Sequence, residues 1–207
     1  MSRKQQNPTL ILASGSAYRR ELLSRLCLPF ESVAPDIDES ALTNEAPEQT
    51  ALRLAEQKAA AIAKNHPNSI VIGSDQVATL DGEHIGKPGT HEAALLQLQK
   101  MRGKTVIFHT AICLIDNRSA IHENRIGSAI QTENVQTLVA FRQLSDCELD
   151  AYLRIEQPYD CAGSAKNEGL GITIIEKIVS NDPTALTGLP LILLTTMLRN
   201  IGVPFYG

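Results

Sequence analysis

The spacing of apolar residues changes several times along the 207-residue chain, and this limits the choice of fold more than any other feature. Short apolar runs with β-branched residues predict strands at residues 9–13, 30–34 and 69–73. Between and after these runs, apolar side chains recur every three or four positions, which predicts helices at residues 46–65 and 90–101. Strands that alternate with helices are typical of an α/β fold.

The middle of the chain adds antiparallel strands. Residues 104–142 alternate in polarity and are rich in Thr, Val and Ile, which predicts two or three strands with a break at residues 116–119. Ser145 and Glu148 then have the spacing of a capping box, so we expect a helix from Ser145 to about Ile155.

The last part of the chain contains a loop, a strand and a helix. Small residues at 159–171 predict the loop, an apolar run predicts a strand at residues 172–179, and the spacing of residues 189–201 predicts a closing helix. The whole order predicts one α/β domain over residues 1–207, with a mixed, twisted sheet flanked by helices. Two lobes around a cleft are left open.

Composition and charge exclude several classes of protein. The net charge of −4 argues against a nucleic-acid partner. The longest apolar run, residues 189–194, is far shorter than the roughly 20 residues that span a bilayer, so we expect no membrane partner. The first eight residues lack the apolar core of a signal peptide, which predicts a cytoplasmic protein. The four cysteines, which form no C-x-x-C pair and so disfavour a zinc or redox site, are Cys27, Cys113, Cys147 and Cys161.

Four short polar clusters remain, most of them at the ends of predicted strands. In open α/β sheets, ligands bind beyond the carboxyl ends of strands, so we expect these clusters to meet in one crevice. In the first cluster, Gly15 lets the backbone approach a ligand, the following helix N-terminus offers N–H groups to an anion, and Arg19 adds a planar charge. The clusters span residues 14–20, 74–76, 86–88 and 163–169.

Single charged residues in or near these clusters suit catalysis. Asp75 follows a buried strand, where a carboxylate suits a hydrated metal ion or a nucleophilic water, although a turn aspartate explains it equally well. Lys58 lies one position off the apolar stripe of its helix and can extend toward a cleft. For Lys58, Lys87 and Lys166, a solvated surface position is the alternative.

Taken together, the clusters resemble the Maf family of nucleoside triphosphate pyrophosphatases, within the broader inosine-triphosphate-pyrophosphatase-like fold. The resemblance covers residues from about 10 to 201 and includes Asp38-Glu39 and Gly188-Leu189-Pro190. It implies a central cleft and hydrolysis between the α and β phosphates with a divalent cation, Mg²⁺ or Mn²⁺. By this resemblance Asp75 is the general base and a metal ligand, and Glu39 is the second metal ligand. The phosphate-binding residues that the resemblance implies are Ser14, Arg19, Lys58, Lys87 and Lys166.

Tyr18, Gln76 and Glu168 resemble the branch of the family that acts on 7-methyl-GTP. A 7-methylated guanine is positively charged, so the Tyr18 ring can hold it by a cation–π attraction of about 0.5–2 kcal/mol, and Glu168 can accept its N–H donors. The chain departs from the pattern with Ala17 in place of proline and Tyr18 in place of the tryptophan common in this branch.

Two other functions stay open at this point. One is a dTTP or UTP pyrophosphatase of the same family, and the other is a nucleotide-sensing regulator of cell division. A homodimer is also left open.

Overall fold

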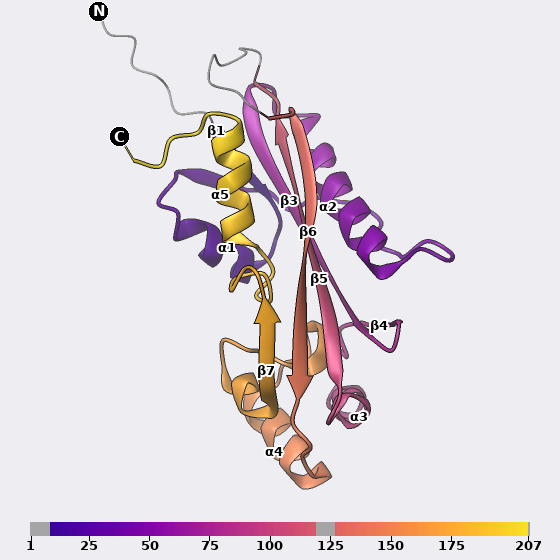
Figure 1. Cartoon of the computed structure of the whole chain (residues 1–207). Coiled ribbons are helices and arrows are strands. Elements are labelled where there is room, and N and C mark those ends of the chain that lie inside the picture. The colour runs from indigo at the N-terminus through magenta and orange to yellow at the C-terminus, as the bar shows by residue number, and fades with distance from the viewer. Residues whose placement is uncertain (1–8, 119–126, 207) are drawn as a thin grey trace, which may run out of the picture.

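The structure is a computed structural model that describes residues 9–118 and 127–206. Within these residues, seven strands form one mixed sheet in the order β2-β1-β3-β5-β6-β7, with β4 paired to β3 (Figure 1). The strands are β1 (Thr9–Ala13), β2 (Phe30–Ser32), β3 (Ser69–Leu80), β4 (Glu83–Ile85), β5 (Thr105–Asp116), β6 (Ile130–Phe141) and β7 (Ile175–Ser180). The helices are α1 (Ala17–Ser24), α2 (Pro47–Ala63), α3 (His91–Met101), α4 (Asp146–Glu156) and α5 (Leu191–Asn200), with 3₁₀ segments η1 (Ala162–Ser164) and η2 (Leu170–Ile174).

The three long strands β3, β5 and β6 run the length of the molecule, and the other elements attach to one half or the other (Figure 1). The upper half of Figure 1 holds β1, β2, α1, α2 and α5, and the lower half holds β4, β7, α3 and α4. Strands β1 and β2 pair in parallel, whereas β3, β5, β6 and β7 form antiparallel ladders. The predicted fold class, a mixed sheet flanked by helices, is confirmed.

Side chains of β1 alternate between two apolar cores. Leu10 and Leu12 pack with α1 and α5, while Ile11 and Ala13 pack with α2. Helix α2 lies so close to the sheet that a Cβ atom on Gly73 would collide with the backbone carbonyl of Ala55. This close approach brings the middle of α2 over β3.

Most predicted elements are confirmed within a few residues, and the Ser145–Glu148 capping box is present at the start of α4. The prediction for residues 172–179 is wrong at its start, because residues 170–174 form a 3₁₀ turn and the strand begins at Ile175. Residues 104–142 form two strands, β5 and β6; Ser119, in the predicted break, lies outside the described residues.

The prediction that Asp75 follows the end of a strand is also wrong. Strand β3 continues through Asp75 to Leu80. Its neighbour β1 ends at Ala13, opposite Gly73, but β5 pairs with β3 from Ile70 to Thr79 and keeps it extended. Asp75 therefore lies on a rigid strand, just beyond the point where the parallel neighbour stops.

Among the described residues, none of the helices has the length and apolar character needed to cross a bilayer.

Candidate active site

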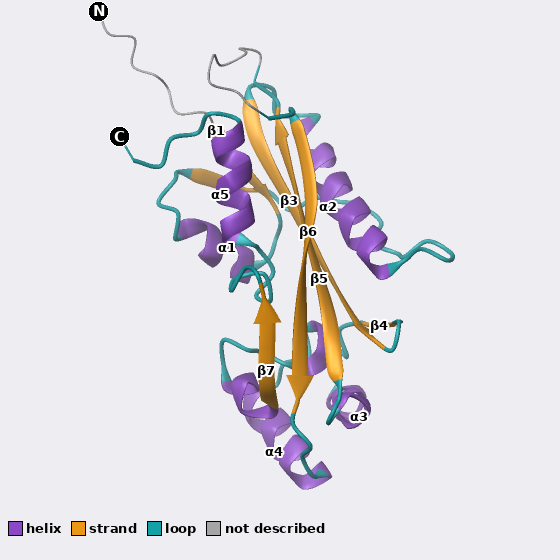
Figure 2. Ribbon diagram, in the orientation of Figure 1, coloured by secondary structure: helices purple, strands orange, loops and turns teal. Residues whose placement is uncertain are grey.

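A cavity of about 540 Å³ opens beside β3 where β1 ends. The loop between β7 and α5 lies beside α1 (Figure 2), where Arg19 of α1 donates to the carbonyl of Gly188 in this loop. The walls of the cavity come from both halves of the molecule, and they include nine of the ten predicted site residues. These nine are Ser14, Tyr18, Arg19, Glu39, Lys58, Asp75, Gln76, Lys87 and Glu168.

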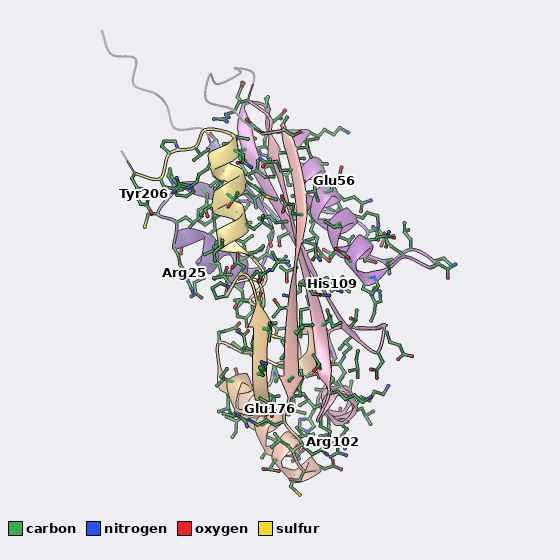
Figure 3. The ribbon with its side chains drawn as sticks, viewed as in Figure 1. Arg25, Glu56, Arg102, His109, Glu176 and Tyr206 are labelled. Carbon is green, nitrogen blue, oxygen red and sulfur yellow. The ribbon has the colours of Figure 1, made fainter. Side chains whose placement is uncertain are left out.

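Lys58 is buried at the centre of an ion-pair cluster. Its Nζ donates to Asp75 Oδ1 at 2.7 Å and lies 2.9 Å from Glu39 Oε1. The Lys58 side chain extends from α2 to Asp75 on β3. Glu56, two residues earlier on the helix, is exposed to solvent (Figure 3). Lys58 is only 5% exposed, so the solvated-surface alternative is wrong for this lysine.

Asp75 is 6% exposed, and its surroundings act on its pKa in opposite directions. Burial raises the pKa, while the neighbouring charges of Lys58 and Arg19 lower it, and the balance leaves the pKa of Asp75 above its ordinary value. A carboxylate with a raised pKa is a stronger proton acceptor than a carboxylate with an ordinary pKa. Asp75 is therefore a buried carboxylate with two cationic neighbours and a raised pKa.

Arg19 connects the loop between β1 and α1 to the loop before α5. Its Nε donates to the carbonyl of Gly188 at 2.8 Å, and its Nη1 lies 3.5 Å from Ser14 Oγ. Ser74 Oγ donates to the same Gly188 carbonyl at 2.9 Å, and Asp182 holds the loop by accepting from two N–H groups at the start of α5. Burial lowers the pKa of Arg19, and the carboxylates of Asp75 and Glu39 oppose that shift.

The side-chain amide of Gln76 is held in one orientation. Its Nε2 lies 2.9 Å from Thr110 Oγ1 and 3.1 and 3.0 Å from the carbonyls of Ala185 and Leu186. These three acceptors identify the nitrogen, so the Oε1 atom remains as an acceptor on a residue that lines the cavity. The carbonyls of the loop before α5 were missed by the sequence analysis, since backbone groups carry no residue-type signal.

Lys166 is the predicted site residue that does not line the cavity. Its Nζ lies 5.7 Å from the centroid of the Tyr18 ring and 3.5 Å from Glu156 Oε1. The neighbouring Asn167, for which the sequence predicts no role, and Glu168 do line the cavity. Burial raises the pKa of the Tyr18 hydroxyl above its ordinary value. Phosphate binding by Lys166 stays a prediction.

Lys87 is exposed and reaches the cavity from the loop between β4 and α3. Backbone and side-chain hydrogen bonds hold this loop on both sides of the lysine. Gly89 N donates to the carbonyl of Tyr159 at 3.0 Å, and Gln97 Nε2 donates to the carbonyl of Gly86 at 2.8 Å.

The described residues contain no group of three or more His, Cys, Asp or Glu side chains that could hold a metal ion. Glu39 and Asp75 nevertheless share the ammonium of Lys58, which places two carboxylates close together. Magnesium is commonly bound by one or two carboxylates together with substrate phosphates. The donor set therefore fits a divalent cation that a triphosphate also coordinates.

Comparison with known proteins identifies the family. The model for Maf-like proteins matches residues 9–201. The chain belongs to the Maf family. This Maf protein is 61% identical over 199 residues to the 7-methyl-GTP pyrophosphatase of Ralstonia nicotianae, covering 96% of this chain and 98% of the relative. It is 62% identical to the enzyme of the same name from Cupriavidus metallidurans, with 97% of this chain and 96% of the relative covered.

Among solved structures, this Maf protein is similar to a nucleoside-triphosphatase / dITP/XTP pyrophosphatase from Mycobacterium abscessus. The two share 16% identity, and the match has a TM-score of 0.41 over 93% of this chain and 95% of the other.

Proposed function

We propose that this Maf protein hydrolyses 7-methyl-GTP between its α and β phosphates, giving the monophosphate and pyrophosphate. The observation that carries the proposal is the buried Asp75–Lys58 pair, which shares one cavity with Glu39, Arg19 and Tyr18. Relatives that are 56–62% identical over nearly their whole length bear the name of this activity, which supports the choice of substrate.

Asp75 acts as the general base. It accepts a proton from a water molecule, the water oxygen bonds to one of the two phosphorus atoms that share the bridging oxygen, and the bond from that phosphorus to the bridge breaks. Lys58, Arg19 and Lys87 neutralise the phosphate charge, since phosphoryl transfer depends mainly on positioning and electrostatic stabilisation. A bound Mg²⁺ or Mn²⁺, held by Glu39 and Asp75 with phosphate oxygens, would supply further neutralisation of charge.

Recognition of the base falls to other residues that line the same cavity. The ring of Tyr18 offers a face to the positively charged 7-methylguanine, and the carboxylate of Glu168 offers acceptors to its N–H groups. The Oε1 atom of Gln76 supplies a further acceptor, because its amide nitrogen is already engaged.

The test is a panel of 7-methyl-GTP, GTP, dTTP and UTP with Mg²⁺ or Mn²⁺, with pyrophosphate and monophosphate both measured. We expect the highest kcat/KM for 7-methyl-GTP and loss of pyrophosphate release with a chelator. Faster turnover of dTTP or UTP would assign the other substrate class, and nucleotide binding without pyrophosphate release would indicate a sensor.

A further inference from the structure

Gln97, in the middle of α3, joins two loops that line the cavity. Its Nε2 donates to the carbonyl of Gly86 at 2.8 Å, and its Oε1 accepts from Ser164 Oγ at 2.7 Å. Gly86 immediately precedes Lys87, and Ser164 lies in the segment that leads to Glu168. Gln97 does not itself line the cavity. One side-chain amide thus connects the loop that carries Lys87 to the segment that carries Asn167 and Glu168.

The second loop is held firmly where Gln97 binds it. Ser164 is fully buried and has a φ of 53°, which is uncommon for a residue other than glycine. Tyr152 Oη donates to the Ser164 carbonyl at 3.2 Å, and Lys166 N donates to Tyr152 Oη at 3.3 Å. Gln97 therefore binds a segment that hydrogen bonds to Tyr152 also hold in place.

A second connection joins the same two loops at positions farther along the chain from Lys87 and Glu168. Gly89 N donates to the carbonyl of Tyr159 at 3.0 Å. The ring of His91 lies between Tyr159 Oη, at 3.0 Å from Nδ1, and Asp150 Oδ1, at 2.8 Å from Nε2. The two loops are thus joined at two places, and Gln97 provides the connection nearer to Lys87 and Glu168 in the sequence.

We propose that Gln97 is a positioning residue that sets the distance between Lys87 and the Asn167–Glu168 segment. The inference rests on the proposed function, because it assumes that one nucleotide contacts both loops. A site that holds both ends of a substrate needs a fixed spacing to bring the reacting atoms together, and small displacements reduce the rate strongly. A ligand that contacts only one loop does not depend on this spacing.

Three variants and a control separate this role from a general effect on folding. Gln97→Met removes both hydrogen bonds and keeps a side chain of similar length. Gln97→Glu keeps an acceptor for Ser164 but turns a carboxylate oxygen toward the Gly86 carbonyl, and Ser164→Ala removes only the bond to the second loop. The control is Gln99→Met on the same helix, where no side-chain hydrogen bond of Gln99 is recorded in the described part of the chain.

The experiment compares the whole nucleotide with its two parts. Calorimetry measures binding of pyrophosphate and of 7-methylguanosine, and steady-state kinetics give kcat/KM for 7-methyl-GTP. Loss of one hydrogen bond corresponds to a change of about three- to tenfold. We therefore expect kcat/KM for 7-methyl-GTP to fall by at least about threefold in each of the three variants. We expect both parts to bind each variant within about twofold of the wild type, because the proposed function places pyrophosphate on Lys87 and 7-methylguanosine on Glu168, so that each part contacts one of the two loops.

The variants act on one connection, so Gln97→Met combined with Ser164→Ala loses no more kcat/KM than Gln97→Met alone. Kinetics like those of Gln99→Met in all three variants would overturn the inference, as would an equal loss for the parts and the whole nucleotide. Thermal melting identifies a variant that does not fold, and the remaining two still decide. A wild-type protein that binds neither part and hydrolyses no triphosphate would overturn the proposed function itself, and the inference with it.

Discussion

Two groups of residues that line the cavity have different surroundings: the proposed catalytic pair Asp75 and Lys58, called here the chemical end, and the proposed base-recognition pair Tyr18 and Glu168, called the recognition end. At one end, Asp75 on a central strand and Lys58 on a packed helix are each about 5% exposed and joined by a 2.7 Å hydrogen bond. At the other end, Tyr18 is half-buried and Glu168 is exposed, and Glu168 lies on a loop. The residues proposed for the chemistry are thus buried between a strand and a helix, while those proposed for recognition, Tyr18 in the first turn of α1 and Glu168 on a loop, are more exposed. We expect substitutions at the first end to change kcat and those at the second to change KM.

Asp75→Asn should have the largest effect. The amide keeps an acceptor for Lys58 but cannot take a proton, so kcat should fall by about 10²–10⁴-fold if Asp75 is the general base. Steady-state pyrophosphate release measures this. Asp146→Asn, which changes an exposed carboxylate on α4, is the control and should keep wild-type kcat. Near-wild-type turnover in Asp75→Asn would remove Asp75 from the role of base.

The pH dependence should follow the raised pKa of Asp75. Only the ionised carboxylate accepts a proton, so kcat/KM should fall about tenfold per pH unit below this pKa. Because the pKa is raised, the loss begins at a higher pH than for an ordinary aspartate. Lys58 lowers this pKa, so Lys58→Met should move the acid limb to still higher pH. An acid limb that stays in place in this variant would contradict the assignment.

Lys58 also bears on how a cation enters the site. Two carboxylates, Asp75 and Glu39, lie with two cationic groups, Lys58 and Arg19, so the cluster has little net charge to attract a free dication. We expect the wild type to bind Mn²⁺ weakly without nucleotide and Lys58→Met to bind it about tenfold more tightly, since an ammonium is removed. Electron paramagnetic resonance of free Mn²⁺ measures this directly. Equal affinity in both proteins would contradict this interpretation.

The comparison of the two ends also explains what could be predicted from the sequence. The strand at residues 9–13 and the Ser145–Glu148 capping box of α4 follow from local patterns of apolar and capping residues. The continuation of β3 through Asp75 does not, because it depends on pairing with β5. The contact between Gln97 and Ser164 joins residues 67 positions apart, and no local pattern reports it.

Tyr18→Ala tests the recognition end. Removing the ring should raise the KM for 7-methyl-GTP by about 2- to 30-fold, which corresponds to a cation–π attraction of about 0.5–2 kcal/mol. The KM for GTP should rise less, because unmethylated guanine carries no full positive charge. Tyr18→Trp is the matched variant and should lower the KM for 7-methyl-GTP, since tryptophan has the best ring for this contact. Equal changes for the two nucleotides in Tyr18→Ala would contradict a cation–π role.

Lys166→Met should have the smallest effect, and its sign distinguishes two roles. The ammonium lies 5.7 Å from the centre of the Tyr18 ring, where it competes with a cationic base for the aromatic electrons. We therefore expect the KM for 7-methyl-GTP to fall by about two- to threefold, while the KM for GTP changes little. Lys177→Met, on the exposed side of β7, is the control for loss of one positive charge. If Lys166 instead binds phosphate, the KM values for both nucleotides will rise together, because the triphosphate is common to them.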